Sequence, residues 1–361
     1  MAPTRLRFLL HALMAAAATA AAESTRFLGR VNPATRELTW PATGIAVAFD
    51  GTTASIPITS QWGTVAVEMV IDDGPPIAIP NVNGSAITTP TVLPKGRHTM
   101  TVRKKSEAYF GSLFLGQPTT DGELVDLDPA PKRSIEIIGD SISVGYGLEG
   151  VFPCANAADN EAATKTYGAL TARNLSAEYS IVAWSGKGVT RNYVAPGPDL
   201  DPRMPELWTR WAAGDASVSY DFSTLVDAVV INLGTNDFSF DPAIRPQLDV
   251  GVFSDAFARF LEQVREVYPS AVVFLTGSPL LNDGTAEKQK SKHSAVMRET
   301  AERFGPDVHF VEFPTQDASN NNIGCDYHPS AKTNQELAVI LTAAMRTVMG
   351  WDACKRSRFR A

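Results

Sequence analysis

The sequence predicts an α/β protein in which a three-layer, doubly wound parallel sheet is preceded by a small antiparallel β-sandwich. Residues 26–125 contain short stretches where apolar and polar residues alternate between frequent turns, as in antiparallel sandwiches. Residues 134–352 contain continuous apolar runs separated by helical patterns, as in parallel sheets covered by helices on both faces. A length of 361 residues is sufficient for two such domains.

The first domain is predicted from strands that end at turn residues. Residues 45–49 form an apolar stretch closed by Asp50-Gly51, and residues 65–71 form another closed by an acidic, glycine- and proline-containing turn. Such spacing indicates a jelly-roll-like β-sandwich. Residues 126–133, with two prolines, are the expected linker between the domains.

The second domain is predicted from buried strands and amphipathic helices. One helix carries apolar residues on one face from Phe253 to Val267 and ends before Pro269. Another carries them from Leu337 to Val348 and ends near Gly350. The strands expected between the helices are Ile135–Ile138, Tyr179–Trp184, Ala228–Leu233, Ala271–Thr276 and Val308–Val311.

Composition and the N-terminus indicate a secreted protein. Residues 1–22 contain a basic start, an apolar stretch and Ala20-Ala21-Ala22, which together predict a signal peptide rather than a membrane anchor. The net charge is −7 and no long basic, aromatic-rich block is present, so nucleic acid is not an expected partner. No later segment is apolar and long enough to span a bilayer, so no membrane partner is expected either.

Four short polar motifs contain the residues needed for acyl transfer by a serine. They are Gly139-Asp140-Ser141, Ser185-Gly186-Lys187-Gly188, Gly234-Thr235-Asn236-Asp237 and Asp326-Tyr327-His328-Pro329. The first three follow apolar strands, and open α/β sheets bind their ligands at the carboxyl ends of strands. Together the motifs supply a nucleophile, oxyanion donors, a base and an acid.

Each candidate residue has a predicted role and a simpler structural alternative. Ser141 is the expected nucleophile, although serine in this position also commonly caps a helix. His328 is the expected base, and Asp326 the acid that orients it, although Asp326 could instead cap a turn. The Ser141 N–H, Gly186 and Asn236 are the expected oxyanion donors, although Gly186 and Asn236 are also typical turn residues.

These motifs resemble those of the SGNH, or GDSL-type, hydrolases over about residues 134–350. The N-terminal part, including Gly29-Arg30-Val31, Trp40 and Gly96 to Lys104, resembles the β-sandwich of carbohydrate esterase family two. The common superfamily pattern has the acid three residues before the histidine, where this chain has Cys325. The resemblance implies either Asp326 or a backbone carbonyl as the group that orients His328.

No cofactor and no metal are expected. No His-x-x-x-His or Cys-x-x-Cys pair is present. The glycine-rich segment 145–150 matches a dinucleotide-binding motif, but it does not directly follow a strand and no clear helix follows it. Tyr193 and Tyr327 lie in polar loops and are the expected contacts for sugar rings.

The three cysteines are expected to form one disulfide in an oxidising compartment. Cys154 follows the Ser141 motif and Cys325 adjoins His328, and these motifs must meet for catalysis. We therefore predict a Cys154–Cys325 bridge, with Cys354 unpaired. A Cys325–Cys354 bridge is the alternative.

The resemblance implies a secreted serine esterase that removes acetyl groups from acetylated polysaccharide or oligosaccharide. Two other functions remain open at this point. One is a lipid or thioester hydrolase of the same superfamily, which the absence of a long apolar lid-like loop disfavours. The other is a non-catalytic carbohydrate-binding protein, which the presence of all four motifs disfavours.

Overall fold

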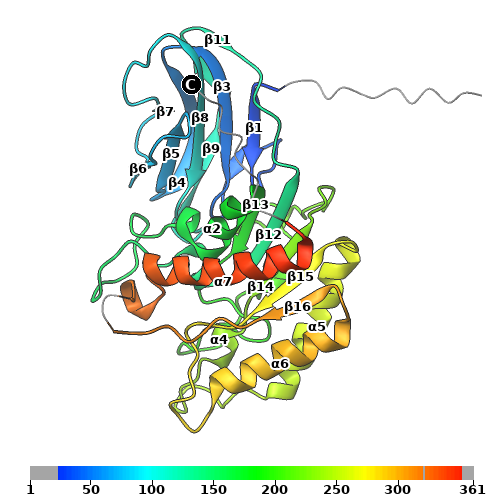
Figure 1. The fold of residues 1–361 in the computed structure, drawn as a ribbon. Coiled ribbons are helices and arrows are strands. Elements are labelled where there is room, and N and C mark those ends of the chain that lie inside the picture. The colour runs from blue at the N-terminus through cyan, green and yellow to red at the C-terminus, as the bar shows by residue number, and fades with distance from the viewer. Residues whose placement is uncertain (1–22, 320–321, 352–361) are drawn as a thin grey trace, which may run out of the picture.

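The structure is a computed structural model that describes residues 23–319 and 322–351. The predicted signal peptide and Cys354 lie outside the described residues. Figure 1 shows an antiparallel β-sandwich stacked on a domain of helices and parallel strands, as the sequence predicts.

The N-terminal domain consists of two antiparallel sheets. Within the described chain, one sheet has the order β1-β3-β8-β5-β6 with β11 beside β3, and the other has the order β10-β4-β9-β2 with β7 beside β4. The strands are β1 (Thr25–Leu28), β2 (Glu37–Leu38), β3 (Gly44–Gly51), β4 (Ala54–Gly63), β5 (Val67–Ile71), β6 (Ile77–Ile79), β7 (Ala86–Thr88), β8 (Gly96–Lys104), β9 (Gly111–Leu115), β10 (Thr119–Thr120) and β11 (Glu123–Leu124).

Alternation along these strands produces the core of the sandwich. Ile45, Val47 and Phe49 of β3 are buried together with Met100 and Val102 of the neighbouring β8. Successive side chains of a strand point to opposite faces, so every second residue of β3 enters the same apolar layer. The period-two pattern seen in the sequence is therefore the pattern of the inter-sheet core.

The C-terminal domain is a parallel sheet with the order β13-β12-β14-β15-β16. Its strands run continuously apolar because both faces are covered: Ile137 lies in one core, and its neighbour Ile138 in the other. The strands are β12 (Arg133–Gly139), β13 (Ala177–Ala183), β14 (Ala228–Asn232), β15 (Val272–Thr276) and β16 (Val308–Val311).

Two helix layers enclose this sheet (Figure 1). Helices α2 (Tyr167–Asn174) and α7 (Ala331–Met349) pack on one face, with Leu337 and Leu341 buried there. Helices α5 (Val250–Val267) and α6 (Gln289–Phe304) pack on the other, with Phe253 and Met297 buried there. The short helices are α1 (Ser141–Val144), α3 (Met204–Leu207) and α4 (Thr235–Phe238), with 3₁₀ turns η1 (Ala163–Lys165) and η2 (Cys325–Tyr327).

The two domains share buried contacts. Trp40 of the sandwich is fully buried in the core between the sheet and α5, and its indole N–H donates to the Trp211 carbonyl at 3.0 Å. Arg30 pairs with Glu136 of β12 at 3.0 Å, and both side chains are almost fully buried. No helix among the described residues is long and apolar enough to cross a membrane.

Candidate active site

The four polar motifs converge at the carboxyl ends of β12, β13 and β14. Ser141 begins α1 directly after β12, Gly186 follows β13, and Asn236 lies in α4 after β14. Strand β12 pairs with β13 on one side and β14 on the other, so chain connections leave it in opposite directions along the sheet. Such a point is where open α/β sheets place their binding crevice.

His328 lies in hydrogen-bonding contact with Ser141. Its Nε2 is 2.8 Å from the Ser141 Oγ. The histidine directly follows η2 and precedes Pro329, in the short segment that leads into α7. This distance is the one required for a base that removes the proton of a serine nucleophile.

The Asp326 backbone carbonyl, rather than its carboxylate, contacts His328. The carbonyl oxygen lies 3.1 Å from His328 Nδ1. The Asp326 carboxylate accepts hydrogen bonds from the Tyr146 hydroxyl at 3.0 Å and the Asn156 N–H at 3.1 Å. The prediction that the Asp326 carboxylate orients His328 is therefore not matched by the contacts, and the alternative arrangement, a backbone carbonyl, is the one present.

The backbone conformation of η2 explains this difference. Asp326 and Tyr327 both have left-handed φ angles, of 48° and 62°. Non-glycine residues in this region cost on the order of 1–3 kcal/mol each and cluster at functional sites. The turn directs the Asp326 carbonyl toward the imidazole while its carboxylate binds the segment after α1.

Tyr146 encloses the imidazole from one side. Its ring stacks on the His328 ring with centroids 4.1 Å apart. Burial by such neighbours lowers the pKa of His328 to about 4, and the Asp326 carbonyl and carboxylate only partly oppose this. At neutral pH the imidazole is therefore uncharged and able to accept a proton.

Three residues that line the cleft, Ser141, Gly186 and Asn236, carry the N–H groups expected to bind an oxyanion. The backbone N–H groups of Ser141 and Gly186 have no acceptor among the described residues. Gly186 has a φ of 77°, a conformation that favours glycine. The Asn236 amide lies in the same cleft and donates to the Lys187 carbonyl at 2.9 Å and the Asp140 carboxyl at 3.2 Å.

Two buried aspartates hold the loops that carry these donors. Asp237 accepts hydrogen bonds from the N–H groups of Val189, Thr190 and Arg191, which fastens the loop after Gly186. Asp140 accepts from the Ile142 N–H at the start of α1. Burial, together with the nearby charge of Asp237, raises the pKa of Asp140 to about 7.

A disulfide joins the histidine loop to the segment after Ser141. Cys154 and Cys325 are bonded, with Cα atoms 4.6 Å apart, within the range expected for a disulfide. The glycine-rich segment 145–150 packs against this bridge: a Cβ on Gly150 would lie 2.1 Å from the Cys325 sulfur. Any side chain at position 150 would clash with the disulfide, which explains why this residue is glycine.

The Ser141 region opens into a cleft of about 900 Å³. Tyr193 and Tyr327, the tyrosines expected to contact sugar, both line it and are each 61% exposed. Tyr109 and Phe110 of the N-terminal domain also line the cleft, and Tyr109 is 70% exposed. The walls thus combine exposed aromatic rings with the polar groups around Ser141.

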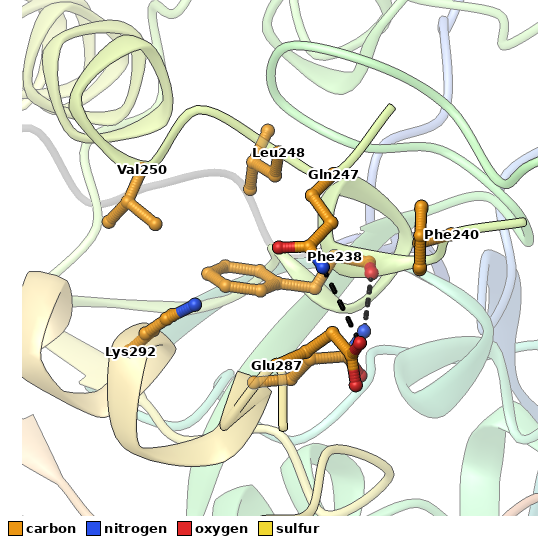
Figure 2. A pocket seen from close by; sticks show the side chains of 8 residues that line it. Phe238, Phe240, Gln247, Leu248, Val250, Glu287 and Lys292 are labelled. Carbon is orange, nitrogen blue, oxygen red and sulfur yellow. Dashed lines mark hydrogen bonds between the residues drawn. The ribbon is translucent and has the colours of Figure 1, made fainter. Parts of the chain in front are cut away.

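A second cavity lies nearby but is too small for a sugar. Figure 2 shows it lined by Phe238, Gln247 and Lys292 among others, with hydrogen bonds from Gln247 to Glu287 and from Gln289 to the Phe238 carbonyl. Its volume is about 20 Å³, room for about one water molecule. It is therefore a packing gap beside the cleft.

Several residues around the cleft were not predicted from the sequence. Tyr146 stacks on His328, Asn156 binds Asp326, and Glu107 of the N-terminal domain lines the cleft beside Ser185. Sequence motifs mark residues next to strand ends, whereas these residues reach the site from the other domain or from irregular loops. No local pattern around Glu107 distinguishes it from a surface glutamate.

Comparison with known proteins matches both domains to protein families. The model of the GDSL-like Lipase/Acylhydrolase family matches residues 137–336, and the model of the Carbohydrate esterase 2 N-terminal domain matches residues 27–129. A cellulase/esterase from Acetivibrio thermocellus is 36% identical over 321 residues, covering 86% of this chain, which spans 38% of that protein. An acetylxylan esterase / glucomannan deacetylase from Cellvibrio japonicus is 29% identical over 376 residues, covering 97% of this chain and 99% of that protein.

Solved structures show the same two-domain arrangement. A carbohydrate esterase family 2 enzyme from Corynascus thermopiles (Myceliophthora fergusii) is 49% identical, with a TM-score of 0.88 over 91% of this chain and 100% of that chain. A family two carbohydrate esterase from Clostridium thermocellum, in complex with cellohexaose, is 32% identical, with a TM-score of 0.80 over 91% of this chain and 100% of that chain.

Proposed function

The chain belongs to carbohydrate esterase family 2, within the GDSL-like hydrolases, and from this premise we propose that it is a secreted serine esterase that removes acetyl groups from carbohydrate. The observation that carries the proposal is the 2.8 Å contact between His328 Nε2 and Ser141 Oγ, beside backbone N–H groups that have no acceptor among the described residues. This arrangement fits attack on an ester carbonyl.

The mechanism follows from the positions of these groups. His328 Nε2 removes the Ser141 hydroxyl proton as Oγ bonds to the ester carbonyl carbon. The oxyanion formed is bound by the N–H groups of Ser141 and Gly186 and by the Asn236 amide, which exchanges its contact with Asp140 for one with the oxyanion. The bond between the carbonyl carbon and the sugar oxygen then breaks, the sugar oxygen takes the proton from His328 and leaves as a hydroxyl, and an acetyl group remains on Ser141.

Water completes the cycle. His328, neutral again, removes a proton from a water molecule that attacks the acetyl carbonyl. Collapse of the second tetrahedral intermediate returns the proton to Ser141 and releases acetate. The Asp326 carbonyl accepts a hydrogen bond from the His328 Nδ1–H throughout, which keeps Nε2 directed at the reacting atoms.

An acetylated polysaccharide or oligosaccharide is the proposed substrate. The cleft, about 900 Å³, is much larger than an acetyl group and has exposed tyrosine rings on which sugars can stack. The similar Cellvibrio japonicus protein is named as acting on acetylxylan and glucomannan. The disulfide and the predicted signal peptide support secretion.

Acetate release from defined esters tests this proposal. Acetylated xylan, acetylated glucomannan, p-nitrophenyl acetate, a long-chain p-nitrophenyl ester and an acyl thioester are incubated with the protein and with its Ser141→Ala variant, and the released acid is measured. We expect the unsubstituted protein, but not Ser141→Ala, to release acetate from at least one acetylated glycan. Preference for long-chain acyl esters or acyl thioesters would favour a lipid or thioester hydrolase. Glycan binding without release from any ester would favour a non-catalytic role.

The acid limb of the pH–activity profile should lie well below the ordinary histidine pKa. His328 accepts a proton only when neutral, and burial lowers its pKa to about 4. Activity, measured as kcat/KM on p-nitrophenyl acetate, should therefore fall as pH decreases through about 4, and ionisation of His328 should produce no limb near pH 6.5. The charged group near the ring is the Asp326 carboxylate; Tyr146 stacks on the ring, and because burial and Asp326 raise its pKa, it stays neutral in this range.

Asp140 provides the control for that profile. Its carboxyl, with a pKa of about 7, lies beside Asn236, so it could add its own limb near neutral pH. A limb near pH 7 that disappears in Asp140→Asn belongs to Asp140. A limb near pH 6.5 that persists in that variant would contradict the lowered pKa of His328.

Substitution of Asp326 should have only a small effect. In Asp326→Asn the backbone carbonyl still faces His328 Nδ1, and an amide oxygen can still accept from Tyr146 and Asn156. We expect kcat to fall by less than about threefold, against the ~10⁴-fold loss found when the carboxylate of a triad is neutralised. A loss near that larger value, with unchanged KM, would show that the carboxylate orients His328.

A further inference from the structure

A loop of the N-terminal domain reaches into the catalytic domain. Residues 105–110 connect β8 to β9. Glu107, at the centre of this loop, is 1% exposed, and its carboxyl accepts a hydrogen bond from the Ser185 N–H at 2.8 Å. Ser185 directly precedes Gly186, whose N–H is a proposed oxyanion donor. A side chain from the first domain therefore holds the backbone beside the oxyanion site of the second.

The loop is held in place from both domains. The buried Lys104 Nζ donates to the carbonyls of Ser106 and Glu107 at 2.7 and 2.8 Å. The Lys105 carbonyl accepts from the Ala163 N–H at 3.1 Å, and the Lys105 side chain pairs with Glu149. A loop held by this many contacts has little freedom to move, so the position of the Glu107 carboxyl is well defined.

The same loop connects to the histidine side of the site. Glu161 accepts hydrogen bonds from the Glu107 N–H at 2.7 Å and from the Asn156 amide at 2.8 Å. Asn156 in turn donates its N–H to the Asp326 carboxylate and accepts from the Gly147 N–H at 2.7 Å. Burial raises the pKa of both Glu107 and Glu161, and their mutual repulsion raises that of Glu161 further, so the pair is expected to hold a proton.

We propose that Glu107 is a positioning residue for the oxyanion hole: it fixes the Ser185–Gly186 backbone so that the Gly186 N–H faces the charge that develops on the substrate. This role rests on the proposed esterase function. It also gives the β-sandwich a part in the reaction, because the sandwich supplies a group that shapes the catalytic site.

The effect should appear in the transition state rather than in substrate binding. An oxyanion exists only after Ser141 attacks, so a misplaced donor raises the barrier without weakening ground-state binding. A misplacement of about 1 Å can cost roughly 100-fold in rate. Loss of the Glu107 contact is therefore expected to reduce kcat by about 10- to 100-fold while KM changes less than about threefold.

Three substitutions at this position separate positioning from folding. Glu107→Met keeps the length of the side chain but removes the acceptor for the Ser185 N–H. Glu107→Gln keeps an acceptor oxygen, and its amide can donate to Glu161, so kcat should stay within about threefold of the unsubstituted value. Glu107→Asp shortens the side chain by one methylene and should also lower kcat. It provides the test if the Met variant does not fold.

Glu68→Met is the matched control. Glu68 is another buried carboxylate of the sandwich, and it accepts a hydrogen bond from Thr164 of the second domain at 3.2 Å, but it does not line the cleft. If docking of the domains were all that mattered, Glu68→Met and Glu107→Met would change the melting temperature and kcat alike. We expect only the Glu107 variant to lose kcat.

A transition-state analogue gives the decisive measurement. Phenylboronic acid forms a tetrahedral adduct with a catalytic serine and places an oxygen in the oxyanion hole. Its inhibition constant should weaken in Glu107→Met by about the factor by which kcat falls, and stay near the unsubstituted value in Glu107→Gln. Unchanged kcat and unchanged inhibition in both the Met and the Asp variants, with the unsubstituted protein active, would overturn the proposal. An unsubstituted protein that hydrolyses no ester would instead refute the proposed function itself.

Discussion

Ser141→Ala is expected to lower kcat for ester hydrolysis by a factor on the order of 10⁴ or more. The alanine has no oxygen to bond to the carbonyl carbon, so no acyl-enzyme forms, and only the remaining groups of the site can assist water. Initial rates on p-nitrophenyl acetate and on an acetylated glycan measure the effect. KM for the glycan should change little, because the walls of the cleft are intact.

Ser143→Ala is the matched control for this variant. Ser143 lies two residues further along α1, is buried, and shares a 2.9 Å hydrogen bond with the Tyr167 hydroxyl rather than with His328. It should keep kcat within about tenfold and lower stability instead, by about 1–3 kcal/mol, because its partner is left unpaired. If Ser141→Ala turned over substrate at the ordinary rate, or if both variants lost kcat equally, Ser141 would not be the nucleophile.

His328→Ala should produce a loss of similar size, again on the order of 10⁴ or more in kcat. Without the imidazole at 2.8 Å, the Ser141 hydroxyl keeps its proton and is a weak nucleophile. Because the two residues act as one unit, the double variant Ser141→Ala/His328→Ala should be no less active than either single variant. If the losses of kcat in the two single variants multiplied in the double variant, the two residues would act independently.

Two further measurements test whether the loss of activity in His328→Ala comes from the missing base. Added imidazole should restore part of the activity of His328→Ala, since a small base can enter the space beside Ser141, and it should not restore that of Ser141→Ala. His98→Gln serves as a control histidine: it lies in the β-sandwich, paired with Asp72, and should leave kcat unchanged. Full activity of His328→Ala without imidazole would exclude it as the base.

The elements of the fold were predictable because their signals are local. Continuous apolar runs such as Ile135–Ile138 predicted buried parallel strands, and the structure shows β12 with both faces covered. The observed strand ends differ from the predicted ones by one or two residues; β13, for example, begins at Ala177 rather than at Tyr179. Helices α2 and α6 were not individually predicted; α6 is rich in polar residues, so its apolar periodicity is weak.

The sequence by itself determined which residues are the candidates for the proposed chemistry. Ser141, Gly186, Asn236 and His328 each lie in a motif beside a strand or helix end, and a parallel sheet brings such ends together. The same reasoning placed Cys154 near Cys325, because each cysteine lies close to a motif that must meet the other, and the structure joins them.

The tertiary structure decided how these groups are oriented and supported. The left-handed backbone at Asp326 and Tyr327 turns a carbonyl rather than a carboxylate toward His328, and no sequence pattern encodes that turn. Glu107 reaches Ser185 from another domain, 78 residues earlier in the chain. Hydrogen bonds of this kind depend on distances of a few ångströms between segments remote in sequence. Such distances are set only when both domains have packed, whereas strand and helix patterns are set by neighbours along the chain.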